Sequence, residues 1–565
     1  MVNYLRSNLL DSSSPNPSIE TLLHAYLPFK YVDHTHSNAI LSLVNLDNSK
    51  EILNKIYKDK IAIVPYVMPG FELAKLCHMV ISKNHKVEGL ILLNHGIFTF
   101  GSSAKQSYDR MIKLVTLAEN FLNKQKKLIK YNINNKKINI TDVQLCIRNL
   151  YHSFTNKKWI IKFNNKVEDV KFTNRKDLFN LFNKGPVTPD HVIRIKSEPL
   201  IIPNKHLSSS KMISNHINAY IKKYKNYFKK YKKNITNSKI ADPLPRIIIL
   251  EGIGFLSIGL NKKEMQVSYD IFDAMKKVII KANLVSKFKS INNTDIFKME
   301  YWPLERAKLN NQNTKKFNGN VAVITGGAGK IGSAIANKFI NENIEVILLD
   351  KNFKNLDINI KKKCLCIVCD LTNNSQINKA LNKILKLFGG IDILIANSGA
   401  AFQGSMLNVK KDILEKSLEV NFYSHHNIVQ KIANIMVSQG FGGSISLNLS
   451  KQSINPGKDF GPYGIAKASS LFSMKQYALE FGKYNIRVNG INADRIKSGL
   501  LTDQFIKERA KARNMSSTEY LNNNLLQKQV TAEDVAEAFF AQLSFEKTTG
   551  NIITVDGGNI EASLR

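Results

Sequence analysis

The stretch VAVITGGAGKIGSAIANKFI, residues 321–340, decides the fold of the C-terminal part of this chain. Its apolar opening predicts a strand that is buried on both faces of a parallel sheet. The glycines that follow predict a tight turn, and the apolar spacing after them predicts a helix. Such a unit lets the backbone approach a pyrophosphate, which lies at the N-terminus of the helix. A glycine turn alone is weak evidence, so its weight depends on the neighbouring stretches.

Further apolar strands alternate with helices after this unit, which predicts a doubly wound parallel sheet with its ligand at the carboxyl ends of the strands. Asp350 ends the second strand, where a carboxylate can bind both ribose hydroxyls and repel a 2′-phosphate. NAD is therefore favoured over NADP, although Lys351 weakens the preference. Asp370 ends the third strand and is placed to meet the adenine. These strands are IEVILLD (344–350), CLCIVCDLT (364–372) and IDILIANSGA (391–400).

The stretch SKQSINPGKDFGPYGIAK, residues 450–467, carries a candidate catalytic group. Tyr463 and Lys467 stand at i and i+4, so they share one face of a helix. The ammonium is then expected to favour the ionised phenol and to lower its pKa, which suits proton transfer near neutral pH. Ser450 can hydrogen-bond a substrate oxygen beside it. The alternative is an ordinary amphipathic helix with a surface lysine.

The ordered set of these motifs resembles the short-chain dehydrogenase/reductase family over about 250 residues. The chain also has LEVNFYSHH (418–426) and the closing TGNIITVDGGN (549–559) that the resemblance requires. The resemblance implies that Tyr463 is the acid/base, that Ser450 orients the reacting oxygen, and that Asn421 holds a proton-relay water. Lys467 would lower the phenol pKa and bind the nicotinamide ribose. The implied cofactor-binding residues are Thr325, Gly326, Gly329, Ile331, Gly332, Asp350, Asp370, Leu371, Asn397, Gly399, Tyr463, Lys467 and Ser498.

The N-terminal part contains a candidate metal site. His34 and His36 alternate in YVDHTHSNAI, so both point to one face of a strand, and His95 ends the apolar run VEGLILLNHG. Two histidines in an H-x-H arrangement and a distant third can form a three-nitrogen site with an open position. Glu20 could supply a carboxylate as a ligand or a base. The alternative is that these histidines are structural.

The stretches PSIETLLHAYLP, YVDHTHSNA, VPYVMPGFELAK and LLNHGIFTFG resemble the class II aldolase/adducin family, especially bifunctional rhamnulose-1-phosphate aldolase/short-chain dehydrogenase proteins. The resemblance implies that His34, His36 and His95 bind zinc or another divalent metal and that Glu20 is the catalytic carboxylate. In that family a longer segment with a phosphate-binding loop comes first. Only nineteen residues precede Glu20 here, and none resembles that loop. We therefore expect this half to be N-terminally incomplete and its lyase activity to be uncertain.

The composition of the chain limits its possible partners and its cellular compartment. The net charge of +36 could serve nucleic acid or an anionic membrane, but it is spread along the chain with abundant Lys, Asn and Ile, which indicates codon bias. The five cysteines form no disulfide framework, and CLCIVC is interpreted as a buried strand rather than a metal site. No stretch is long and apolar enough for a membrane span. A reducing cytoplasm fits these features.

The expected fold class is α/β, with a C-terminal Rossmann sheet joined to an incomplete class II aldolase-like domain. We expect an aldolase-like domain at 1–125, the remainder of that half and a connector at 126–315, and the NAD-binding domain at 316–565. His191, in the connector, could lie near the metal or be structural. The basic helical run 221–235 could touch RNA or lipid, or pack its aromatic side chains on the protein.

The expected function is an NAD(H)-dependent oxidoreductase of a small hydroxy-carbonyl or sugar-derived substrate, such as lactaldehyde, in rhamnose metabolism. The expected partners are a small-molecule substrate and other copies of the chain, as a dimer or tetramer. Neither a specific nucleic acid nor a membrane is expected. Alternatively, the aldolase-like half is a non-catalytic interaction module, or the charge serves nonspecific nucleic-acid binding.

Overall fold

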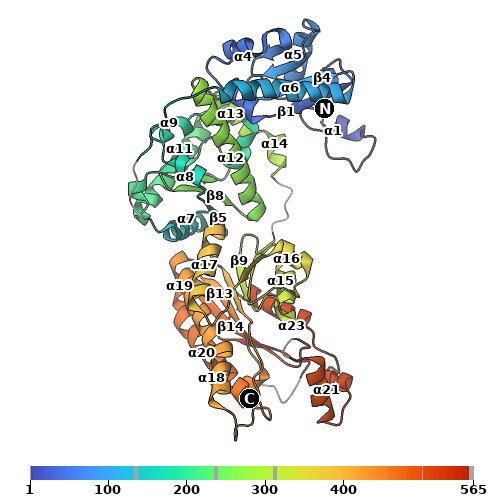
Figure 1. Cartoon of the computed structure of the whole chain (residues 1–565), viewed down its shortest axis with the longest axis vertical. Helices are drawn as coiled ribbons and strands as arrows, with labels where there is room; N and C mark the ends of the chain where they lie inside the picture. Colours follow the sequence, from blue (N-terminus) through green and yellow to red (C-terminus); the bar gives the residue numbers. More distant parts are fainter. Residues whose placement is uncertain (1, 133–137, 235–238, 310–314, 499–500, 559–565) are drawn as a thin grey trace.

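The computed structural model describes residues 2–132, 138–234, 239–309, 315–498 and 501–558. Three sheets follow one another along the chain, two of four strands and one of seven. Figure 1 shows the first sheet in the blue part of the chain, the second in the green part, and the third in the yellow-to-red part. Within the described ranges, every helix is too short or too polar to cross a membrane.

The first sheet has the strand order β1-β4-β3-β2. β4 pairs antiparallel with both neighbours, and β2 pairs parallel with β3. The strands are β1 Tyr31–Thr35, β2 Ile61–Val64, β3 Gly89–Leu92 and β4 Gly96–Gly101. The helices are α1 Val2–Ser7, α2 Thr21–Tyr26, α3 Asn38–Val44, α4 Ser49–Tyr57, α5 Phe71–Ser82 and α6 Ala104–Asn123.

The second sheet repeats this topology, with the order β5-β8-β7-β6 and the same pairing directions. Its strands are β5 Ile160–Asn164, β6 Leu200–Ile202, β7 Ile247–Leu250 and β8 Gly254–Gly259. Its helices are α7 Ile140–Thr155, α8 Val167–Thr173, α9 Leu178–Phe182, α10 Val192–Ile195, α11 Ser210–Tyr231, α12 Lys262–Val285, α13 Asn293–Glu300 and α14 Pro303–Ala307.

The two sheets also agree in local detail. The turn between β3 and β4 has Asn94 with φ +56°, and the turn between β7 and β8 has Gly252 with φ +71° at the same position. Each hairpin ends in a glycine followed two residues later by an N-cap, Ser103 for α6 and Asn261 for α12. The strand registers align His34, His36 and His95 with Phe163, Asn165 and Ile253. The repeat therefore keeps the scaffold of the first sheet without its histidines.

One hydrophobic core joins the two sheets. Ile40 and Leu114 of the first unit are buried together with Phe272 and Ile279 on α12. Because these side chains are fully withdrawn from water, they stabilise the two units as a pair. The basic helix α11 contributes to the second unit in the same way, since Phe228 and neighbouring aromatic side chains are buried. Its aromatic face is packed on the protein, which is one of the two alternatives set out above.

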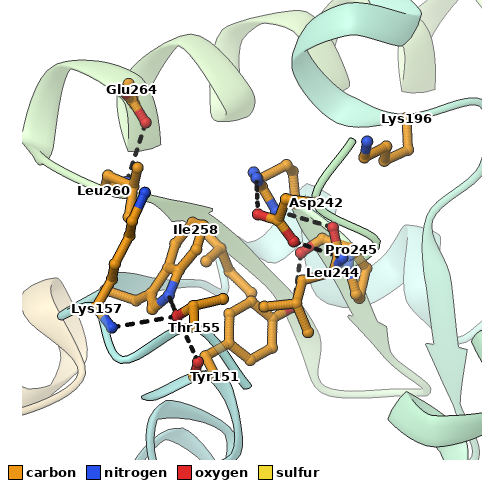
Figure 2. Close-up of polar contacts among 12 residues, drawn as sticks. Tyr151, Thr155, Lys157, Lys196, Asp242, Leu244, Pro245, Ile258, Leu260 and Glu264 are labelled. Atoms are coloured by element: carbon orange, nitrogen blue, oxygen red, sulfur yellow. Dashed lines mark hydrogen bonds and ion pairs between the residues drawn. The ribbon is translucent and has the colours of Figure 1, made fainter. Parts of the chain in front are cut away.

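A polar network fixes the segment that enters β7 (Figure 2). Tyr151 donates a hydrogen bond to the carbonyl of Pro245 at 2.6 Å. Asp242 accepts from the Arg246 guanidinium at 2.6 Å and from the Leu244 amide at 2.9 Å. Burial alone would raise the pKa of Asp242, but the charge of Arg246 lowers it. Arg246 is thus paired with the carboxylate of Asp242.

The third sheet is fully parallel, with the order β11-β10-β9-β12-β13-β14-β15. The order reverses between β9 and β12, which opens a crevice at the carboxyl ends of these strands. The strands are β9 Val321–Thr325, β10 Glu345–Asp350, β11 Leu365–Val368, β12 Ile393–Ala396, β13 Gly443–Asn448, β14 Ile486–Ala493 and β15 Ile552–Val555. The helices are α15 Lys330–Asn341, α16 Ile358–Lys363, α17 Asn374–Phe388, α18 Lys411–Leu418, α19 Ser424–Gln439, α20 Gly461–Phe481, α21 Asp503–Lys511, α22 Ser517–Asn522 and α23 Ala532–Ser544.

A buried ion pair connects the second unit to the third. Arg148 on α7 donates to both carboxylate oxygens of Asp392, at 3.1 and 2.7 Å, and to the Trp159 carbonyl at 2.8 Å. Asp392 precedes β12 and also accepts from the Val321 amide at 2.8 Å. Burial would raise the pKa of Asp392, but the charges of Arg148 and Lys158 lower it. The second unit therefore holds the third sheet at the amino ends of its central strands.

Replacing Arg148 by methionine should destabilise this junction. The substitution leaves Asp392 buried without its partner, and such a loss costs about 3–5 kcal/mol. We expect the urea midpoint followed by the fluorescence of buried Trp159 to fall. Lys316→Met removes an exposed ion pair with Glu546 and should change the free energy of unfolding by about 0–1 kcal/mol. Equal midpoints for both variants would contradict the importance of the buried pair.

Candidate functional site

Two adjoining cavities lie at the carboxyl ends of the strands of the third sheet. The larger, of about 830 Å³, is an elongated cleft along the glycine turn and β10. The smaller, of about 280 Å³, lies under α21 and the start of α20. Both are lined by Ile331, Ala401, Asn448 and Ser498. Ten residues expected to bind the cofactor line the cleft: Gly326, Gly329, Ile331, Gly332, Asp350, Asp370, Leu371, Asn397, Gly399 and Ser498.

A chain of hydrogen bonds organises the floor of these cavities. Thr325 Oγ1 accepts from the Asn397 amide at 2.9 Å and from the Ser398 amide at 3.1 Å. Asn448 Nδ2 donates to Asn397 Oδ1 at 2.8 Å. Lys467 Nζ in turn donates to the Asn448 carbonyl at 2.9 Å. The turn after β9 and the lysine on α20 are thus held in one polar network.

The glycine turn brings the backbone of β9 close to its neighbours. Gly326 has φ +62°, and a Cβ on it would lie 2.8 Å from the Ser398 Cα. A Cβ on Gly332 would lie 2.2 Å from the Gly326 carbonyl oxygen. Lys330 opens α15 with an exposed side chain. The turn therefore accommodates this lysine at the first position of the helix.

Asp350 lines the cleft, and its carboxylate is hydrogen-bonded to the backbone of the glycine turn. Its Oδ2 accepts from the Ala328 amide at 2.9 Å. Lys351 directs its ammonium away from this carboxylate to Asp370 Oδ2, at 3.0 Å. Burial would raise the pKa of Asp370, but hydrogen bonds from Thr372 and the charge of Lys351 lower it. The lysine that weakens the expected preference for NAD is thus paired with a different residue.

Tyr463 and Lys467 project from α20 as the i and i+4 spacing predicts, with the ammonium 5.8 Å from the centre of the phenol ring. The expected lowering of the phenol pKa is absent in this structure. Burial raises the pKa of Tyr463 to about 12, and the hydrogen bond with Ser450 offsets only part of the shift. Burial also lowers the pKa of Lys467 to about 8. Desolvation of both groups outweighs their attraction, which the spacing alone could not reveal.

Asn421 is fully buried in a π-helical turn, η5 (Glu419–Tyr423), between α18 and α19. Its side chain accepts from the Ala400 amide at 3.0 Å and donates to the Ala400 carbonyl at 2.9 Å. Its carbonyl accepts from Ser470 at 2.9 Å. His425, one turn later, contacts the Ser398 carbonyl at 2.6 Å, and burial lowers its pKa to about 3. These residues fix the loop after β12 next to Lys467.

The smaller cavity has residues that the sequence analysis did not single out. Tyr463 and Ser450 form one side of it, and α21 and α22 cover the other. Asn448 was missed although it ends an apolar strand, a position that could have identified it. The others carry no local motif, because the packing of two short helices over the cavity brings them together. They are Lys451, Lys458, Phe460, Phe505, Arg509, Arg513 and Tyr520.

A second candidate site lies in the first sheet, where Glu20, His34, His36 and His95 meet. One ligand atom from each lies within 4.8 Å of the others. Glu20 Oε1 is 2.8 Å from His95 Nε2 and 3.4 Å from His34 Nε2. Burial would raise the pKa of Glu20, but hydrogen bonds from His34 and His95 lower it. The H-x-H strand end and the distant histidine come together, and Glu20 joins them.

The donor set fits a divalent cation. Among the described residues, the Nε2 atom of His36 is buried without a hydrogen-bond partner, and that of His34 lies 3.4 Å from Glu20 Oε1. His34 Nδ1 lies 2.9 Å from the Ile97 carbonyl, which orients the ring and leaves Nε2 as the acceptor. Burial, followed by the charge of His34, lowers the pKa of His36 and keeps its imidazole neutral. Neutral imidazoles with one carboxylate suit zinc and similar ions.

The second unit contributes a carboxylate next to this cluster. Asp190 precedes His191 in a short 3-10 turn, η2 (Pro189–His191). Burial would raise the pKa of Asp190, but the charge of His191, a hydrogen bond with Thr188 and the charge of His36 lower it. His191 is half-buried, and its Nδ1 is buried without a partner among the described residues. Both units therefore border the histidine cluster.

Comparisons with known proteins agree with this arrangement. Residues 1–122 match the class II aldolase and adducin N-terminal domain, residues 139–309 the second domain of class II aldolases, and residues 326–559 the family described as enoyl-(acyl carrier protein) reductase. The short-chain dehydrogenase reductase 3a of Arabidopsis thaliana is 27% identical over 43% of this chain and 96% of its own length. The crystal structure of NAD⁺-bound xylitol dehydrogenase is 23% identical, with a TM-score of 0.41, over 43% of this chain and all of that one.

One relative spans almost the whole chain. The uncharacterized oxidoreductase YuxG of Bacillus subtilis is 30% identical over 99% of this chain and 85% of its own length. This match includes both four-stranded sheets and the parallel sheet. The chain therefore belongs to the same family as YuxG, and it joins class II aldolase domains to a domain of the short-chain dehydrogenase/reductase type.

Proposed function

We propose that the C-terminal domain is an NAD(H)-dependent oxidoreductase that acts on a small hydroxy-carbonyl or sugar-derived molecule, of which lactaldehyde is a simple example. The observation that carries this proposal is the meeting of two cavities, one along a glycine turn and the other beside Tyr463 and Ser450. Their shared lining supports a reaction in which a substrate oxygen near Tyr463 meets the end of a bound dinucleotide. The relatives with dehydrogenase names support the same reaction type.

Each residue of the site has its own role in this reaction. Ser450 holds the substrate oxygen beside Tyr463, whose hydroxyl gives a proton to a carbonyl oxygen or takes one from an alcohol. The raised pKa of Tyr463 keeps the phenol protonated at neutral pH, as proton donation requires. Lys467, with a pKa of about 8, can gain or lose a proton near neutral pH. When bound, the nicotinamide supplies or accepts the hydride.

For the N-terminal half we propose a zinc or other divalent-metal site related to that of rhamnulose-1-phosphate aldolase, with a role in rhamnose metabolism. His34, His36 and His95 would hold the ion, which supplies Lewis-acid stabilisation of negative charge on substrate oxygens. Glu20, hydrogen-bonded to His95, is placed to move a proton at a substrate carbon. In the alternative, this half is an interaction module that keeps the histidines without catalysis.

We also propose a homo-oligomer, a dimer or tetramer, in the cytoplasm. Ile465, Phe472 and Leu479 recur every seven residues on α20 and are 40%, 71% and 77% exposed. Such an apolar stripe favours contact with a second copy. All five cysteines are free, which suits a reducing compartment. No specific nucleic-acid or membrane partner is proposed.

Replacing Tyr463 by phenylalanine should lower NAD-linked turnover by roughly 10²–10⁴-fold, because the substitution removes the proton-transferring hydroxyl. Binding of NADH, followed by its fluorescence, should stay close to that of the wild type. Tyr484→Phe alters an exposed tyrosine beyond α20 and serves as the control. Undiminished turnover in Tyr463→Phe would refute the assignment of the acid/base.

Replacing Asp350 by alanine should reduce the ratio of kcat/KM for NAD over NADP by roughly tenfold or more, because a charged hydrogen-bond partner of the ribose is lost. Steady-state kinetics with both cofactors measure this ratio. Asp357→Ala removes a carboxylate that caps α16 outside the cleft, and should leave the ratio unchanged. If Asp350→Ala also left it unchanged, another group would decide the preference.

Replacing His34 by alanine should remove most of the bound metal, because the cluster loses one of three imidazole ligands. Elemental analysis after zinc loading and gel filtration measures the ion content per chain. His85→Ala changes an exposed histidine outside the cluster and should retain the wild-type content. A zinc-loaded wild-type protein that emerges free of metal would rule out the site.

A further inference from the structure

The cavity beside Tyr463 is strongly basic. Arg495, Arg509, Arg513, Lys451 and Lys458 line it. Its one acidic lining residue is Asp494, which lies 3.2 Å from the Lys451 ammonium and 3.6 Å from Arg495 Nε. Arg495 is further used in fastening α22, since it donates to the carbonyls of Tyr520 and Asn523. Three basic residues, Lys458, Arg509 and Arg513, remain for a ligand.

Arg509 is held in place by stacking rather than by an ion pair. Its guanidinium carbon lies 4.7 Å from the centre of the Phe460 ring and 5.2 Å from that of Phe505. Its hydrogen bond to the Lys458 carbonyl is long, at 3.5 Å. Aromatic stacking orients the planar fork while it leaves most N–H donors unused. The side chain is thus preorganised to bind an acceptor in the cavity.

Arg513 is arranged in a similar way. Its guanidinium carbon lies 5.5 Å from the centre of the Tyr520 ring, and its hydrogen bond to the Arg509 carbonyl measures 3.4 Å. Within the described ranges, neither Arg509 nor Arg513 forms an ion pair with a carboxylate. Arg148, Arg175 and Arg246 each do so, with Asp392, Asp177 and Asp242. The two cavity arginines are therefore distinct from those that stabilise the fold.

The composition of the chain strengthens this contrast. Only 12 of its 81 basic residues are arginine, and three of these 12 fall between positions 495 and 513. Codon bias toward lysine explains a general positive charge, but it does not explain arginines gathered at one cavity. Arginine binds carboxylates and phosphates through two parallel hydrogen bonds, a geometry that lysine cannot provide. The local choice of arginine thus indicates a planar or branched anion.

We infer that, within the proposed class of hydroxy-carbonyl and sugar-derived molecules, the substrate of the dehydrogenase domain carries an anionic group, a carboxylate or a phosphate, which neutral lactaldehyde lacks, and that Arg509 and Arg513 bind it. The inference rests on the proposed NAD(H)-dependent reaction, because it places the reacting carbon at Tyr463 and the anion under α21. Neither arginine lines the cofactor cleft, so the anion is separate from the pyrophosphate of the dinucleotide. The reaction leaves the anionic group unchanged and uses it for positioning.

Binding experiments test the anion site without turnover. The full chain saturated with NADH is titrated with malonate and with inorganic phosphate by calorimetry. We expect at least one of them to bind the wild type, and affinity to fall roughly tenfold to hundredfold in Arg509→Ala/Arg513→Ala. Lys507→Ala/Lys511→Ala removes two exposed charges from α21, the helix of Arg509 that ends just before Arg513, and should keep the affinity. Preference for malonate or phosphate identifies the group.

Absence of binding of both anions to the wild type would overturn the inference. Equal losses in the arginine and lysine variants would also overturn it, since they would indicate only the general field of the helix. Circular dichroism and NADH affinity confirm that each variant is folded. Arg509→Lys/Arg513→Lys, which keeps the charge, should recover only part of the affinity because the planar fork is lost.

Kinetics separate this inference from the proposed reaction. Rates of NAD⁺ reduction are compared for glycerol, glycerate and glycerol 3-phosphate. We expect a higher kcat/KM for a charged alcohol, and the arginine variants should raise its KM. Equal use of neutral and charged alcohols would reject the anion site and keep the reaction. Arginine-dependent anion binding without NAD-linked turnover of any tested alcohol would keep the site and count against the reaction.

Discussion

The hydrogen-bond chain from Thr325 through Asn397 and Asn448 to Lys467 is the interaction on which the dehydrogenase site depends. It connects the ends of β9, β12 and β13 to helix α20, so the larger cavity and the helix that carries Tyr463 and Lys467 are held in one network. Each member uses polar atoms that would otherwise be buried without partners, which is costly in a low-dielectric interior. Satisfying these groups and positioning Lys467 are achieved by the same contacts.

Local patterns were sufficient for much of the third sheet. The apolar strand before Thr325, the glycines after it and Asp350 at the end of the next strand each report on their immediate surroundings, and the structure has the corresponding β9, α15 and β10. The pKa of Tyr463 was not accessible in this way, because it depends on burial by distant elements. The contact between Arg148 and Asp392 was likewise hidden, since 244 positions separate the two residues.

The second sheet shows another limit of sequence patterns. Its pairing order reproduces that of the first sheet, but the positions that identify the first one chemically carry Phe163, Asn165 and Ile253. Topology is carried by strand directions and by turn positions such as Asn94 and Gly252, which tolerate many side chains. A scaffold can thus be repeated while the chemistry remains in one copy. The second copy instead supplies a surface against which the first is packed, through α12 and the shared core.

The position of the Arg148–Asp392 pair bears on how far apart the two candidate sites lie in one chain. The pair contacts the parallel sheet at the amino end of β12. The larger cavity and Tyr463 lie at the opposite, carboxyl ends of the strands. Figure 1 accordingly shows α7 against the near end of the third unit, and α21 at its far end. Covalent linkage thus ensures equal amounts of two candidate sites that lie in different units of the chain.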